Sequence, residues 1–151
     1  MRTDFLSKGE KKDFLDKLEE QFGIEKINYL FIKSGREKIR AYSGNLSKEE
    51  LKKLNQCVRI EGIGLYFAKE EERGLRLSID ASNLLAEKIK KNILEIDEEQ
   101  ARRWMRGENL EIDNNLRGIL VIKFKEYLLG CGKAGDGRLY NFVPKERRVR
   151  N

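Results

Sequence analysis

The 151-residue sequence predicts an α+β fold, with a small N-terminal α/β domain over residues 1–85 and a mixed β pseudo-barrel over residues 86–151. Helix signals separate strand-like runs in the first part, whereas the second combines one helix signal with about five short strand signals. A barrel pairs the edges of such strands economically. Because the only proline is Pro144, no proline-rich linker separates the parts, and we expect them to pack directly on each other.

The first part begins with a helix and a hairpin. Ser7 and Glu10 have the spacing of a capping box, and apolar residues follow at helical intervals: Phe14, Leu15, Leu18 and Phe22. Gly23 stands where a left-handed residue ends many helices. Residues 27–33 and 38–43 are strand-like runs on either side of the glycine-containing turn SGRE, and they predict a hairpin.

A second helix and a long strand come next. Ser47 and Glu50 repeat the capping-box spacing, and the helix they open carries Leu51 and Leu54 inward. Residues 58–68 are apolar enough for a central strand. The glycines in this run, Gly62 and Gly64, indicate a bulge or a close contact.

The first part ends with a strand and a helix. Apolar and polar residues alternate over residues 75–79, as in a half-buried strand. Asp80 is suited to cap a helix over residues 81–91, whose apolar side is predicted to contain Leu84, Leu85 and Ile89. The domain boundary is expected near this helix.

The second part contains one helix among strands. Residues 92–96 predict a short strand, and Asp97 with Gln100 forms a third capping box. The inner face of that helix is Ala101, Trp104 and Met105, and Gly107 ends it. Three further strand signals follow, at residues 118–125, 127–132 and 138–142.

Composition narrows the function classes. No apolar run approaches the roughly 20 residues of a membrane span, and the N-terminus lacks a signal-peptide pattern, so we expect a cytoplasmic protein. The chain has no histidine and only two cysteines, Cys57 and Cys131, which are too few for a structural zinc site. Both are expected to be free thiols, and neither a metal nor another cofactor is expected.

The C-terminal segment concentrates positive charge. Residues 133–151 contain six basic and two acidic side chains, which is +4 of the formal net charge of +6. Nearby glycines allow close backbone approach, and arginine forks fit phosphate oxygens. The segment therefore predicts anion binding, with nucleic acid as the large anion. The simpler interpretation is a solvated tail. Phe142 and Val143 favour barrel closure, and Tyr140 either closes the barrel or stacks on a base.

These patterns carry a family resemblance. The tail NFVPKERRVR, the GxGKA strand before it and the segment ILEIDEEQARRWMRGENLEI resemble the PUA-type RNA-binding domain at the C-terminus of Nop/Sun-type RNA cytosine-5 methyltransferases. The pre-PUA plus PUA arrangement resembles the ribosome-biogenesis factor Nip. The resemblance implies that Arg103, Arg106 and Gly107 help to form an RNA-contacting surface. It does not extend to the enzyme, because the catalytic cysteine of those relatives follows a proline, and neither cysteine here does.

The first hypothesis is a non-catalytic RNA-binding protein in rRNA processing, ribosome biogenesis or RNA modification, with ribosomal or transfer RNA as its partner. Cations from the helix and from the tail are expected to gather on one side of the barrel. The candidate RNA-binding residues are Arg103, Arg106, Gly107, Lys133, Arg138, Tyr140, Lys145, Arg147, Arg148 and Arg150. The alternative is a protein-interaction module that recruits an RNA methyltransferase or a ribosome-assembly factor.

Overall fold

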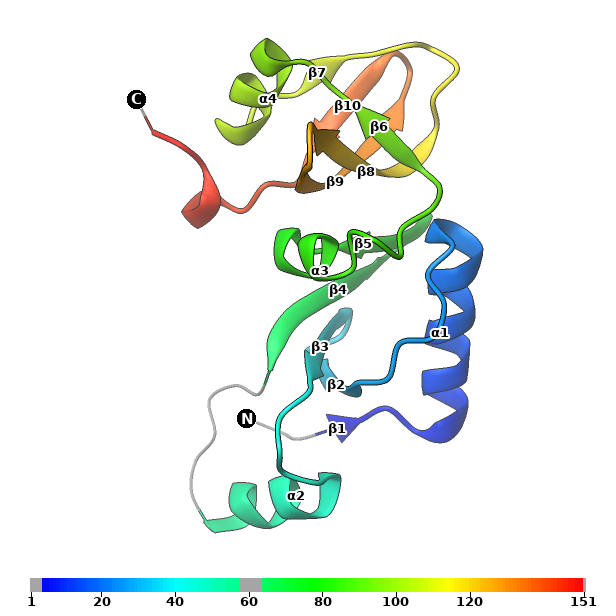
Figure 1. Ribbon diagram of the computed structural model, residues 1–151, viewed down its shortest axis with the longest axis vertical. Coiled ribbons are helices and arrows are strands. Elements are labelled where there is room, and N and C mark those ends of the chain that lie inside the picture. The colour runs from blue at the N-terminus through cyan, green and yellow to red at the C-terminus, as the bar shows by residue number, and fades with distance from the viewer. Residues whose placement is uncertain (1–3, 58–63, 151) are drawn as a thin grey trace.

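A computed structural model describes residues 4–57 and 64–150 of the chain. Two five-stranded sheets form the framework, one from each half, and the C-terminal sheet lies above the N-terminal one in Figure 1. The predicted α+β class is confirmed. Among the described residues, no helix is long and apolar enough to cross a membrane.

The N-terminal sheet is an antiparallel meander in the order β1-β2-β3-β4-β5. Its strands are β1 (Asp4–Phe5), β2 (Leu30–Ser34), β3 (Lys38–Tyr42), β4 (Leu65–Glu71) and β5 (Gly74–Leu77). Helix α1 (Lys8–Phe22) packs on it with Phe14, Leu18 and Phe22 buried. The predicted capping box at Ser7 and the left-handed end at Gly23 are both confirmed.

A bulge separates the first and second halves of β4. Lys38 lies opposite Lys69, but beyond Ile39 the register shifts so that Arg40 lies opposite Tyr66. The shift leaves one extra residue on β4, so Tyr66 and Lys69 reach the same face of the sheet. The predicted close contact at Gly64 is confirmed, since a side chain there would begin 2.1 Å from the Ala41 carbonyl oxygen. Residues 58–63, including Gly62, lie outside the described part of the chain.

Three details of the N-terminal half differ from prediction. Helix α2 (Lys48–Cys57) buries Leu51, but Leu54 is 42 % exposed. Helix α3 (Ile79–Leu84) is shorter than predicted and starts earlier, and its Leu84 is 52 % exposed. Its N-cap is Ser78 rather than Asp80, because the Ser78 hydroxyl accepts the hydrogen bond from the backbone of Ala81. Asp80 is therefore free for another partner.

The C-terminal half is a mixed half-barrel sheet in the order β6-β8-β9-β10-β7. Its elements are β6 (Ile93–Glu95), α4 (Glu98–Met105), β7 (Leu110–Glu111), β8 (Gly118–Phe124), β9 (Tyr127–Gly135), β10 (Arg138–Asn141) and a 3-10 turn, η1 (Lys145–Arg147). Strand β6 is parallel to β8, and the other neighbours are antiparallel. The predicted helix and strands are thus present.

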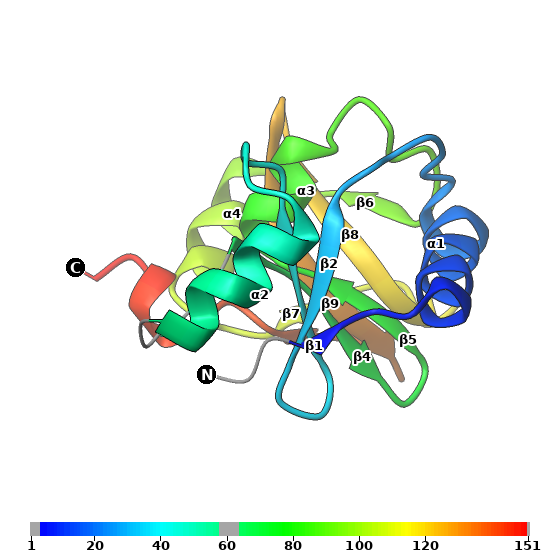
Figure 2. The same ribbon diagram turned by 90° about the horizontal axis from the view of Figure 1, so that it is seen from below.

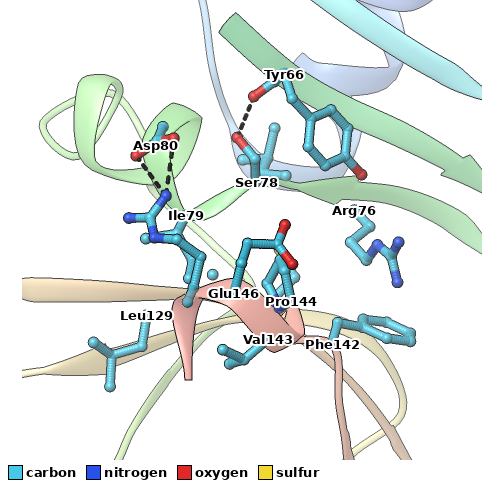
Figure 3. A pocket seen from close by; sticks show the side chains of 14 residues that line it. Tyr66, Arg76, Ser78, Ile79, Asp80, Leu129, Phe142, Val143, Pro144 and Glu146 are labelled. Carbon is cyan, nitrogen blue, oxygen red and sulfur yellow. Dashed lines mark hydrogen bonds and ion pairs between the residues drawn. The ribbon is translucent and has the colours of Figure 1, made fainter. Parts of the chain in front are cut away.

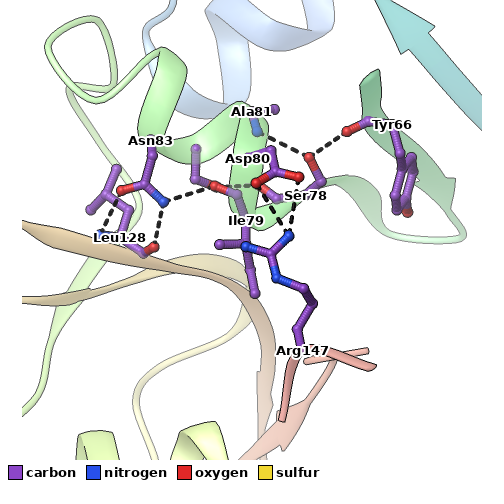
Figure 4. Close-up of polar contacts among 9 residues, drawn as sticks. Tyr66, Ser78, Ile79, Asp80, Ala81, Asn83, Leu128 and Arg147 are labelled. Atoms are coloured by element: carbon purple, nitrogen blue, oxygen red, sulfur yellow. Dashed lines mark hydrogen bonds and ion pairs between the residues drawn. The ribbon is translucent and has the colours of Figure 1, made fainter. Parts of the chain in front are cut away.

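One buried cluster spans the two halves, as expected from the missing linker. Ile119, Val121 and Cys131 of the C-terminal sheet belong to the same buried cluster as the aromatic residues of the N-terminal half. The Asn83 side chain also joins the halves, because its amide donates to the Leu128 carbonyl at 2.8 Å and its oxygen accepts from the Leu128 amide at 3.2 Å (Figure 4). Helix α1 and the C-terminal tail lie on opposite sides of this assembly in both views (Figures 1 and 2).

Candidate nucleic-acid interface

Helix α4 is held in one orientation by its cap and its tryptophan. Asp97 and Gln100 close the predicted capping box through hydrogen bonds of 2.8 and 3.0 Å. Trp104 is fully buried, and its indole N–H donates to the Leu129 carbonyl at 3.0 Å. Rotation of the helix would break this bond, so Arg106 stays exposed at the helix end.

The C-terminal tail lies against the end of α4. Gly107 has φ +92°, and a Cβ there would be 2.5 Å from Nε of Arg148. Arg148 Nε donates to the Val143 carbonyl at 3.1 Å, and the Val149 amide donates to the Met105 carbonyl at 2.7 Å. The glycine therefore permits a close contact between two segments that are about 40 residues apart in the sequence.

Asn141 fastens the start of the tail to the same helix end. Its amide donates to the carbonyls of Trp104 at 2.8 Å and Glu108 at 2.9 Å, while its oxygen accepts from the Val143 amide at 2.7 Å. The carbonyls left free where a helix ends need such donors. Asn141 thus donates hydrogen bonds to carbonyls at the end of α4 and also orients the start of the tail.

Arg147 points away from α4, toward the N-terminal half. Its Nη1 lies 3.2 and 3.1 Å from the two carboxylate oxygens of Asp80, as Figure 4 shows. The side chains of Arg147 and Asp80 are 44 % and 56 % exposed. This ion pair links the tail to the first turn of α3.

The other cations differ in whether an acid neutralises them. Arg102 pairs with Glu98 at 2.9 Å and Arg103 with Glu108 at 3.3 Å. Several predicted residues have no carboxylate from residues 4–57 or 64–150 within 4.0 Å: Arg106, Lys133, Arg138, Lys145, Arg148 and Arg150. Of these, Arg106, Lys133, Arg138, Lys145 and Arg150 are exposed as well. Arg106, Lys145 and Arg150 belong to the two segments that meet at the end of α4, so we take them as the candidates for meeting phosphate there.

Lys133, Arg138 and Tyr140 form a separate group on strands β9 and β10. Tyr140 lies opposite Lys133 in the ladder, and directly opposed residues share a face. Leu139, between Arg138 and Tyr140, is buried in the core beneath α4. These three side chains therefore lie on the sheet face that is turned away from α4.

The C-terminal half of the chain matches a known protein family. The family model described as the PUA domain of methyltransferase RsmF matches residues 91–149. The C-terminal region is a PUA domain of the RsmF methyltransferase type. The predicted resemblance to the Nop/Sun group is confirmed for this region.

The chain also matches curated relatives named ribosomal RNA small subunit methyltransferase F. Identity is 25% over 89 residues to the protein of Vibrio vulnificus and 28% over 90 residues to that of Photobacterium profundum, each match covering 59% of this chain and 19% of the relative. The protein of Aliivibrio salmonicida is 27% identical over 126 residues, covering 83% of this chain and 25% of the relative. The chain thus spans about a fifth to a quarter of the length of these relatives.

Within the PUA domain, the structure unites part of the predicted set. Gly107 and Arg148 are in contact, and Arg106 and Lys145 lie on the same two segments. Arg103 and Arg147 are instead engaged by acids. The convergence of α4 and tail was predicted, whereas the polar contacts of Asn141 were missed because an asparagine between a strand and a proline has no distinctive pattern.

An apolar groove beside α4 was also missed. It has a volume of about 470 Å³ and is lined by Met105, Phe124, Tyr127 and Val149, with Arg106 at its rim. Tyr127 and Val149 are 56 % and 57 % exposed. Tyr127 lies in a predicted strand, and nothing in the sequence distinguishes it from a core residue. Its exposure is therefore evident only from the fold.

Cys131 is not a reactive thiol, and the part of the chain that the structure describes contains no metal site. Burial raises the pKa of the Cys131 thiol to about 12, so this cysteine is protonated at neutral pH. Cys131 is a core residue beneath β5. Among the residues that the structure describes, no group of three or more His, Cys, Asp or Glu side chains is placed to hold a metal ion.

Proposed function

We propose that the protein is a non-catalytic RNA-binding protein that acts in rRNA processing, ribosome biogenesis or RNA modification. The PUA domain would bind structured RNA through the end of α4 and the adjoining tail. Ribosomal or transfer RNA is the partner that this proposal names, and rRNA is favoured because the curated relatives are named for ribosomal RNA methylation.

The observation that carries the proposal is the contact between Gly107 and Arg148. It brings a helix end with Arg106 against a tail with Lys145 and Arg150, three cations that have no carboxylate partner in residues 4–57 and 64–150. Phosphate neutralisation by such cations supplies sequence-independent affinity that falls with salt. Tyr127 in the adjacent groove adds an exposed aromatic ring for an unpaired base.

The absence of catalysis is part of the proposal. Neither cysteine follows a proline, as the catalytic cysteine of the resembled methyltransferases does. A buried, protonated Cys131 is unsuited to attack a base. We infer that residues 1–151 bind RNA without transferring a methyl group.

The first test removes the unpaired cations. Arg106→Ala with Lys145→Ala should weaken binding of an rRNA hairpin and reduce the magnitude of the log–log salt slope by about 1.5, since each phosphate contact contributes about 0.7–0.9. Fluorescence anisotropy titrations at several salt concentrations measure both quantities.

The matched control is Lys8→Ala with Lys12→Ala, which removes the same charge from α1 on the opposite side of the molecule (Figure 2). This control should lower affinity only through net charge. Equal losses in the two double variants would refute the α4–tail surface, and wild-type protein that binds no structured RNA would refute RNA binding itself.

A second candidate function is recruitment of a separate methyltransferase or assembly factor, and the exposed Tyr127 and Val149 favour it. Exposed apolar groups beside cations are typical of protein interfaces as well. Affinity purification with and without nuclease separates the candidates. Protein partners that persist after nuclease and are lost with Tyr127→Ser would support recruitment over RNA binding.

A further inference from the structure

The outer face of the N-terminal sheet carries a row of cations in direct register. Lys38 on β3 lies opposite Lys69 on β4, and Lys69 lies opposite Arg76 on β5. Like charges on directly opposed residues destabilise a sheet. Such a row costs stability unless acids of the protein or a bound anion neutralise it.

Nearby acids neutralise the row only in part. Glu71 lies 3.9 Å from Lys69 and 3.4 Å from Arg76, and Glu37 lies 3.8 Å from Lys69. Lys38 has no carboxylate within ion-pair distance among the described residues. Glu71 Oε1 has no hydrogen-bond partner in the same region, so its ion pairs lack good hydrogen-bond geometry.

Aromatic rings accompany these cations. Because of the bulge in β4, Tyr66 shares the face of the row, and Lys38 Nζ lies 5.5 Å from its ring centroid. Arg76 Cζ lies 4.3 Å from the ring centroid of Phe142, which follows β10 in the PUA domain. The row therefore crosses from one half of the protein to the other.

Between the two halves the row meets a cleft of about 280 Å³. Tyr66 and Arg76 line it from the N-terminal sheet, and Phe142 and Arg147 line it from the tail, as Figure 3 shows for the first three. The cleft thus joins the cation row to the tail segment of the α4–tail surface. A strand leaving that surface along the tail would enter the cleft.

We propose that this face binds a single-stranded RNA segment that extends from the structured RNA held by the PUA domain. The proposal rests on the proposed RNA-binding function. Lys38, Lys69 and Arg76 would contact successive phosphates, and Tyr66 with Phe142 would offer rings to unpaired bases. A duplex keeps its base faces stacked inside, so interleaved cations and aromatic rings fit a single strand.

The test compares two RNAs of identical stem, a blunt hairpin and the same hairpin with a single-stranded extension of about eight nucleotides, within the site sizes of single-strand binders. Wild-type protein should bind the extended hairpin more tightly. Lys38→Ala with Arg76→Gln should remove most of that advantage, a loss of roughly tenfold, and leave the affinity for the blunt hairpin within about twofold.

The charge-matched control is again Lys8→Ala with Lys12→Ala, which should preserve the preference for the extended RNA. An unchanged preference in Lys38→Ala with Arg76→Gln overturns the inference, and so does an equal loss for both RNAs. Failure of the wild type to bind either RNA sinks the proposed function instead. Similar wild-type affinity for both RNAs overturns the inference and leaves that function standing.

A second measurement does not depend on the variant folding. Photocrosslinking of wild-type protein with 4-thiouridine placed only in the extension should label peptides that contain Tyr66 or Phe142. Labels confined to α4 and residues 145–150 would overturn the inference.

Discussion

The two halves of the chain fill their cores with different kinds of side chain. In the N-terminal half, Phe14, Phe31 and Phe67 pack edge to face with ring centroids 5.0 to 6.1 Å apart. In the PUA domain a single Trp104 lies over Gly132, where a Cβ would be 2.6 Å from the indole ring. The first core combines several aromatic rings. The second packs one indole ring against Gly132, a residue of β9 that has no side chain.

In the N-terminal half, the residues of the aromatic core are different from those of the α4–tail surface that we propose binds RNA. The hydrogen bonds between α4 and the tail involve none of these rings, which pack in the cluster that contains the buried residues of α1. Trp104 instead bonds to β9 and carries the helix whose end meets the tail. In the PUA domain, stability and the proposed function therefore rest on the same residue.

The largest expected effect comes from Trp104→Ala. Removal of a buried aromatic side chain costs about 3–5 kcal/mol, a large share of the roughly 5–15 kcal/mol that stabilises a typical domain. Urea denaturation followed by far-UV circular dichroism measures the loss in the free energy of unfolding. Tyr127→Ala, at an exposed ring of the same half, should cost less than about 1 kcal/mol.

The same experiment tests whether the halves are separate folding units at the predicted boundary of residues 85 and 86. Because Ile119, Val121 and Cys131 complete the N-terminal core, we expect one transition in which both halves unfold together. Tryptophan fluorescence of the wild type reports only the PUA domain, so it should coincide with the circular dichroism curve. Two separated transitions would show that each half folds on its own.

A smaller effect is expected at the ion pair that joins the halves. Asp80→Ala should cost less than about 1 kcal/mol, since both partners are substantially exposed. It should raise the affinity for the rRNA hairpin about two- to threefold, because Arg147 is then available to phosphate. Glu87→Ala makes the same charge change at an exposed position and serves as control. Equal gains in both variants would show that only net charge matters.

Local signals predicted most of the fold. The capping boxes at Ser7, Ser47 and Asp97 each depend on residues three apart, and all three are formed. Errors arose where tertiary contacts decide between equivalent local choices. Leu84, Leu85 and Ile89 were all predicted to pack inward, but only Leu85 and Ile89 are buried. Ser78 caps α3, and its hydroxyl also donates to the Tyr66 carbonyl at 2.6 Å.

The candidate interface was less predictable than the fold. The tail cations were identified from residue type and position, and Arg103, Arg106 and Gly107 from the family resemblance, but whether an arginine is available depends on distant acids. Arg147 pairs with Asp80, which is 67 residues away in the sequence, and no local sequence pattern predicts this ion pair. The register of Lys38, Lys69 and Arg76 likewise depends on the bulge in β4, which strand patterns locate only approximately.

The smallest expected effect concerns the first turn of α1, on the side of the molecule opposite the C-terminal tail (Figures 1 and 2). The ammonium group of Lys33, with the Ser7 backbone amide, lowers the pKa of the Glu10 carboxyl from 4.5 to about 2. A pKa below the unfolded value means that this stabilisation is present above about pH 4.5 and is lost as the pH falls toward 2.

In Lys33→Met the Glu10 carboxyl should titrate closer to 4.5, which NMR can follow by its carboxyl carbon shift. Lys12→Met, which breaks only the pair with Asp16, should leave that titration unchanged. Because Glu10 lies at the surface, RNA affinity at neutral pH should be the same in Lys33→Met and Lys12→Met. A larger loss in Lys33→Met would mean that the two halves are less distinct in their roles than their cores suggest.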